Sequence, residues 1–197
     1  MKPIIAALAL AQILALSAAP ALAAPAYPDV TDSSRLDGSG SRVLQLSIDL
    51  KAPPKAVWDA FTDAATVRRW EAPLAIIDLR QGGTMEESYN AKAQPGDPEN
   101  IRHDIIAYVP GQLMVFRNTN TPSRLPGRDS YRNVVSILEV QDLGAGRSRL
   151  VLSQTGYGKG KDFDQLYAFF SEENADLMET LKAALETPTG ALHAAAR

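Results

Sequence analysis

The chain of 197 residues contains no cysteine, only 2 histidines and no excess of basic residues. The absence of cysteine excludes disulfides, thiolate zinc sites, iron–sulfur clusters, thiol catalysis and acylation of a cysteine. The scarcity of histidine excludes most histidine-based metal sites, so we expect no metal and no cofactor. Lys and Arg number 20 against 23 Asp and Glu, a net charge of −3 that argues against a nucleic-acid partner.

Apolar residues make up 45% of the chain and charged residues 22%. These values are typical of a globular domain rather than a disordered chain or a membrane bundle. A single domain of this length buries enough surface to fold without a disulfide or a metal. Composition therefore predicts a globular domain and leaves its chemistry open.

The first 23 residues have the organisation of a secretory signal peptide. Lys2 supplies a positive start, residues 4–16 are apolar apart from Gln12, and residues 21–23 are Ala-Leu-Ala, a cleavage-site pattern. We predict cleavage after Ala23, a periplasmic or secreted protein, and no stable membrane span after cleavage. The alternative is an uncleaved anchor, because the apolar stretch approaches the ~20 residues of a membrane helix.

The rest of the chain divides into a linker, a domain and a tail. Residues 24–41 are rich in Pro, Ser, Asp and Gly and predict a mobile linker, residues 42–187 a domain, and residues 188–197 a tail. Two short helices should follow the first strand, with Pro54 in the first turn of one and Asp63 capping the other. Alternation and turn signals predict strands over residues 42–50, 74–79, 84–91, 101–109, 112–118, 133–140 and 147–155.

A long amphipathic helix should close the domain, from about Asp162 to Glu186, because apolar residues recur there at three- and four-residue steps. Asp162 and Gln165 have the spacing of a capping box. Strands and helices segregate along the chain, which predicts an α+β fold. We expect a curved antiparallel sheet of about six to seven strands wrapped on this one helix.

Four segments carry a resemblance to a known superfamily. They are residues 52–63 (APPKAVWDAFTD), 67–70 (VRRW), 78–84 (DLRQGGT) and 150–157 (LVLSQTGY). Together with the order of elements, they resemble the START-like, or SRPBCC, superfamily, in the branch related to the heat-shock ATPase activator. The resemblance covers about residues 42–186.

This resemblance implies a helix-grip fold with a cavity between the sheet and the long helix. Many relatives hold apolar or amphipathic small molecules in such a cavity. A few use it for cyclisation, hydrolysis or demethylation, and the activator branch implies a co-chaperone-like role.

Two strands carry candidate ligand-binding residues for that cavity. Glu87 shares a strand face with Met85 and Tyr89, and a carboxyl group among apolar neighbours has a raised pKa and can act as an acid. His103 lies mid-strand on the face expected to be buried, where it could serve as an acid or a base. The structural alternatives are an edge-strand carboxylate for Glu87 and a hydrogen-bonded core histidine for His103.

Three further candidates complete the predicted ligand-binding set. Arg117 alternates with apolar residues and could bind a ligand carboxylate, although a strand-end arginine can also simply reach solvent. Tyr167 and Phe170 of the long helix are candidates for an aromatic wall, which small-molecule pockets commonly have.

Three hypotheses for function follow. The favoured one is non-enzymatic binding of a small apolar or amphipathic molecule, with no catalytic residue assigned. A polyketide-cyclase-like or hydrolase-like enzyme would need converging polar groups, such as His103 with Glu87 or Arg117. A co-chaperone-like interaction module would show an exposed apolar patch without an internal cavity. The ligand, any protein partner and the oligomeric state stay open.

Overall fold

The computed structural model describes residues 27–187, in which strands and helices follow one another in the predicted α+β order. The elements are β1 (Val30–Asp32), β2 (Arg35–Leu36), β3 (Arg42–Leu50), α1 (Pro54–Thr62), α2 (Ala64–Trp70), β4 (Leu74–Ile77), β5 (Thr84–Ser88), β6 (Ile101–Val109), β7 (Leu113–Asn120), α3 (Arg128–Tyr131), β8 (Val135–Gly144), β9 (Arg147–Tyr157) and α4 (Lys161–Glu186).

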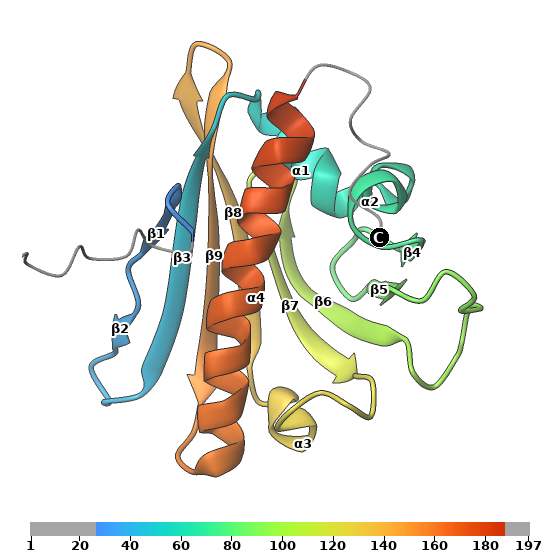
Figure 1. The fold of residues 1–197 in the computed structure, drawn as a ribbon, viewed down its shortest axis with the longest axis vertical. Helices are drawn as coiled ribbons and strands as arrows, with labels where there is room; N and C mark the ends of the chain where they lie inside the picture. Colours follow the sequence, from blue (N-terminus) through green and yellow to red (C-terminus); the bar gives the residue numbers. More distant parts are fainter. Residues whose placement is uncertain (1–26, 188–197) are drawn as a thin grey trace, which may run out of the picture.

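Within the described residues, nine strands form one sheet in the order β1-β3-β9-β8-β7-β6-β5-β4, with β2 also paired to β3. Every pair is antiparallel. Helix α4 crosses one face of the curved sheet, with α1 near its C-terminal end and α3 near its start (Figure 1). This arrangement is the helix-grip architecture that the sequence predicts.

The core lies where α4 packs on β3 and β9. Alternation in β3 places Leu44 and Ile48 on its inner face, and both are 1% exposed. Leu166, Met178 and Leu181 of α4 meet this face and are fully buried. The apolar stripe of α4 and the alternation of β3 therefore account for how the helix is held.

Two of the three predicted helix starts are confirmed. Pro54 opens α1, and the Asp63 side chain accepts a hydrogen bond from the Thr66 backbone N–H at 2.9 Å. The capping box at the start of α4 is wrong, because Gly160 is the N-cap and makes no side-chain cap. Asp162 instead lies in the first turn, where its charge interacts favourably with the helix dipole.

The sheet has more strands than predicted, and the extra strands β1 and β2 lie in residues 24–41, the segment expected to be a linker. β1 and β2 pair with β3 through the backbone, while most of their side chains are exposed or half-buried. Strands held in this way need no apolar alternation, so no periodic pattern in residues 24–41 predicts them. The predicted signal peptide, residues 1–23, and the tail, residues 188–197, lie outside the described residues.

We expect Leu181→Ala to lower the free energy of unfolding by about 2–5 kcal/mol, because it removes a fully buried side chain between α4 and the sheet. Leu177→Ala is the matched control on the same helix, since Leu177 is only half-buried and lines the cavity described below. Urea denaturation of both variants measures the difference. Equal losses of stability would contradict the assignment of Leu181 to the packed contact and of Leu177 to the cavity wall.

Candidate functional site

A partly open cavity of about 800 Å³ lies between α4, the inner face of β5 to β9 and the loop of residues 121–126. It forms because α4 contacts the sheet at β3 and β9, while β6 and β7 curve away from the helix (Figure 1). The side chains that would otherwise pack on α4 therefore face an open volume. Its size falls within the range of small-molecule sites, about 300–1,000 Å³.

Aromatic side chains form much of the cavity wall. Phe170 of α4 lies with its ring centroid 4.6 Å from that of Tyr131 and 5.2 Å from that of Phe169. Phe61 packs edge-on against Trp70 at 5.6 Å. All five residues line the cavity, which therefore offers broad, rigid apolar surfaces to a ligand.

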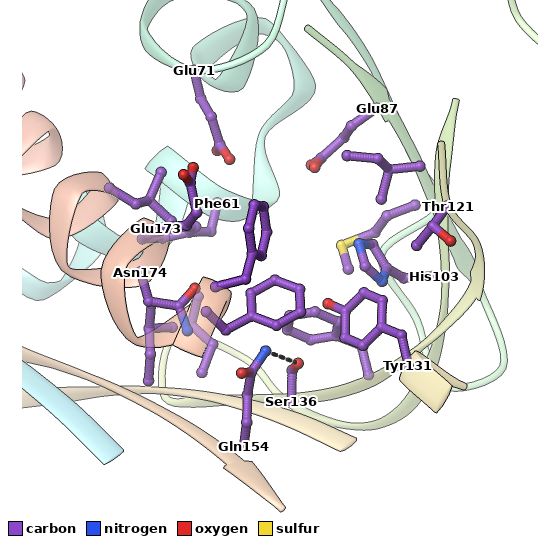
Figure 2. A pocket seen from close by; sticks show the side chains of 18 of the residues that line it. Phe61, Glu71, Glu87, His103, Thr121, Tyr131, Ser136, Gln154, Glu173 and Asn174 are labelled. Atoms are coloured by element: carbon purple, nitrogen blue, oxygen red, sulfur yellow. Dashed lines mark hydrogen bonds between the residues drawn. The ribbon is translucent and has the colours of Figure 1, made fainter. Parts of the chain in front are cut away.

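Two carboxyl groups face each other at one end of this cavity. Glu71 is the residue that ends α2, and Glu87 lies on the inner face of β5 (Figure 2). The Tyr89 hydroxyl donates a hydrogen bond of 3.2 Å to Glu71 Oε1. Within residues 27–187, neither carboxyl group forms an ion pair with a Lys, Arg or His side chain.

Burial without a cation makes both carboxyl groups weak acids. It raises the pKa of Glu71 to about 8, and the negative charge of Glu87 adds to this rise while the Tyr89 hydrogen bond opposes it. Burial likewise raises the pKa of Glu87 to about 7. The pair therefore keeps a proton at neutral pH in the empty cavity.

His103 is a buried histidine with an unused ring nitrogen. Its side chain faces the cavity (Figure 2), the residue is 7% exposed, and Nδ1 has no hydrogen-bond partner within residues 27–187. Burial lowers the pKa of His103 to about 4, so the ring is neutral at pH 7. Phe116 packs edge-on against it with a centroid separation of 5.0 Å. His103 is therefore not the hydrogen-bonded core histidine of the structural alternative.

Strand register separates His103 from Glu87. His103 lies opposite Met85, and Glu87 lies opposite Ile101, so the two side chains share a face as diagonal neighbours. Asp104 is exposed on the other face, as the alternation predicts. The cavity thus presents a neutral imidazole and a carboxyl pair as separate polar groups.

A hydrogen-bonded row of side chains forms a polar part of the cavity wall. The Tyr157 hydroxyl donates to Gln154 Oε1 at 2.6 Å, and Gln154 Nε2 donates to Ser136 Oγ at 3.2 Å. Gln154 and Ser136 line the cavity together with Tyr131, whose pKa is raised by burial (Figure 2). These groups are paired with one another, so they add polarity without unsatisfied atoms.

Five of the seven predicted site residues line the cavity: Met85, Glu87, Tyr89, His103 and Phe170. Met85 and His103 are buried on facing strands, while Tyr89 is 56% exposed at the rim. Their part in binding stays a prediction, since the structure gives only their position.

Arg117 and Tyr167 do not line the cavity, and these two predictions are corrected. Arg117 is exposed, because Met114 and Phe116 occupy the inner face of β7. Tyr167 packs instead against Tyr157 at 5.1 Å, beneath the guanidinium of Arg42 at 5.0 Å. Arg117 was wrong because it lies on the outer face of β7. Tyr167 was wrong because it lies on the side of α4 that faces away from the cavity.

Sequence reasoning missed Glu71, Gln154 and Ser136. Gln154 and Ser136 continue inner faces that also carry Leu152 and Leu138, and a polar residue at a buried position of a strand is a usable signal. Glu71 has no such signal, because it follows α2 in a turn and reaches the cavity only when the fold closes.

Two further searches were confined to residues 27–187. They contain no group of three or more His, Cys, Asp or Glu side chains placed to hold a metal ion. None of their helices combines the length and the apolar character required to cross a membrane.

A curved antiparallel sheet that grips a long C-terminal helix around a cavity defines a START-like helix-grip domain. Residues 51–186 match the family described as "Activator of Hsp90 ATPase homolog 1-like protein", and the chain belongs to this family. A fold of this family supports either a ligand-binding or a co-chaperone-like domain. No curated protein sequence matches the chain significantly.

Solved structures show the same fold at low sequence identity. The Aha1 dimer from Colwellia psychrerythraea is 16% identical with a TM-score of 0.57, over 75% of this chain and 98% of that one. CalU16 from Micromonospora echinospora is 17% identical with a TM-score of 0.56, over 83% and 90%. An HSP90 activator from Plasmodium falciparum is 17% identical with a TM-score of 0.52, over 72% and 92%.

We expect Glu87→Gln to raise the free energy of unfolding of the empty protein at pH 8, and to raise it less at pH 5. Because the folded-state pKa is raised, the unfolded chain loses this proton first, and stability falls as pH rises from about 4.5 to about 7. Glutamine has no proton to lose, so the variant should gain on the order of 1 kcal/mol at pH 8.

Urea denaturation at the two pH values measures this gain. Glu172→Gln, which changes an exposed carboxylate of α4 outside the cavity, is the matched control and should show no such pH dependence. A gain from Glu87→Gln that is larger at pH 5 than at pH 8 would contradict the raised pKa.

Proposed function

We propose that this domain is exported and holds a small apolar or amphipathic molecule in its cavity without catalysing a reaction. The observation that carries the proposal is the cavity itself, about 800 Å³ with walls of aromatic and aliphatic side chains. A few polar groups among apolar walls are the usual composition of a small-molecule site. Family membership supports the same conclusion, because a ligand-binding role is one of the two that the fold allows.

The cavity weighs against the co-chaperone alternative. That hypothesis expected an exposed apolar patch in place of an internal cavity. The structure has instead a partly open cavity bordered by residues from α4 and five strands, β5 to β9. The family's printed description still names an activator of the Hsp90 ATPase, so a protein partner is the second candidate function.

An enzyme of the polyketide-cyclase or hydrolase type is a third candidate, and one observation favours it. Carboxyl groups with a raised pKa and a histidine with a lowered pKa border one cavity. The two carboxyl groups can donate and accept protons near neutral pH, and the neutral imidazole can donate or accept a hydrogen bond. Loss of turnover in His103→Ala, with ligand affinity retained, would favour catalysis over binding.

Binding of the neutral, apolar dye Nile red tests the leading proposal. We expect saturable binding with enhanced fluorescence, because the dye moves from water to an apolar cavity. Leu177→Trp should weaken it by about tenfold or more, equivalent to about 1.4 kcal/mol, by filling the cavity. Ala168→Trp is the control, since Ala168 is exposed on the same helix and does not line the cavity. Equal effects of the two variants would refute binding in the cavity.

Export is tested separately by N-terminal sequencing. The pattern Ala-Leu-Ala at residues 21–23 leads us to expect a mature protein that begins at Ala24 in the envelope or secreted fraction. Substituting Ala21 and Ala23 with bulky residues should block processing. Recovery of the intact chain, starting at Met1, from the cytosolic fraction would overturn the proposal of export.

A further inference from the structure

The two facing carboxyl groups of the cavity have only one hydrogen-bond donor between them among the described residues. Tyr89 supplies one hydrogen bond to Glu71, and no hydrogen bond to the Glu87 side chain occurs within residues 27–187. Each carboxyl group has two oxygen atoms with room for several donors. The free acceptor capacity of Glu71 and Glu87 is directed into the cavity, where a ligand would meet it (Figure 2).

His103 is an independent sign that the ligand makes a polar contact in this cavity. Its residue is more than nine-tenths buried, its ring faces the same cavity, and Nδ1 has no partner in the described part of the chain. An unpaired polar atom at such a position costs free energy in the empty protein. A neutral imidazole has one N–H donor and one acceptor nitrogen, so a ligand group of the matching kind at Nδ1 would satisfy it.

Acidic side chains outnumber basic ones around the cavity. Among the lining residues described, Arg124 is the only Lys or Arg, and it is exposed. Four carboxyl groups line the cavity, from Glu71, Glu87, Glu173 and Asp176. An anionic ligand would approach against this charge, whereas a cationic one would be attracted.

We propose that the cavity binds an amphiphile whose polar end is a protonated amine, seated between the carboxyl groups of Glu71 and Glu87; this rests on the proposed function above. An ammonium group brings three donors and no acceptor, which matches a site rich in acceptors. Its positive charge takes the place of the proton that the pair keeps when the cavity is empty. The aromatic walls contact the apolar body, and Phe61 or Tyr131 can add a cation–π contact.

The test is displacement of Nile red at pH 7 by three probes with the same ten-carbon chain: decylamine, decanol and decanoate. We expect decylamine to displace the dye at about tenfold lower concentration than decanol, a difference of about 1.4 kcal/mol. Decanoate should be the weakest. Equal or better displacement by decanol or decanoate overturns the proposal, and this comparison needs no variant.

Variants then assign the preference to residues. Glu71→Gln with Glu87→Gln should remove the preference, so that decylamine and decanol displace the dye at similar concentrations. Glu172→Gln removes one exposed carboxylate outside the cavity and should keep the preference. A preference for the amine that survives in the double variant overturns the assignment to this pair.

The same assay separates this proposal from the one on which it rests. If Nile red binds in the cavity and the three probes do not differ, only the amine proposal fails. If neither the dye nor any probe binds, the proposal of a small-molecule site fails with it.

Discussion

The packing of α4 against β3 and β9 is the contact on which the site depends. Leu166, Met178 and Leu181 are fully buried at this contact and fix the helix across one part of the sheet. A protein interior normally closes to high packing density, so an open volume has to be maintained by contacts around it. Here those contacts lie at β3 and β9. On the same face of the sheet, the curvature of β6 and β7 leaves the cavity open (Figure 1).

The electrostatics of the site follow from this geometry. Closing α2 and β5 around the cavity partly withdraws two carboxyl groups from water, and neither has an ion-pair partner among residues 27–187, so their ionised forms are disfavoured. Burial acts in the opposite sense on His103 and keeps its ring neutral. The empty protein thus holds a neutral imidazole and a carboxyl pair that keeps a proton, among largely apolar walls. That arrangement lowers the stability of the empty fold and favours whatever ligand pairs with these groups.

The sequence could predict the fold because the relevant signals are local. Alternation in residues 42–50 and the apolar stripe of the last helix identify the two surfaces that meet, and Asp63 marks a helix start correctly. Side chains on β5 and β6 also faced the predicted way. Arg117 failed because an apolar alternation can lie on either face of a strand, and Leu113 and Val115 occupy the outer one. Glu71 could not be predicted, because its position near Glu87 depends on strand register and on how the chain folds back, not on sequence spacing.

His103 and Glu87 offer polar groups at two points of the same cavity wall. They are diagonal neighbours on β6 and β5, a relation with a separation of about 7–8 Å between positions. No ion pair joins them within residues 27–187. Under the proposed function, a ligand of moderate length would meet the carboxyl pair with one group and His103 with another. Two polar contacts at different points along an apolar body fix its orientation, which is what a selective binding site requires.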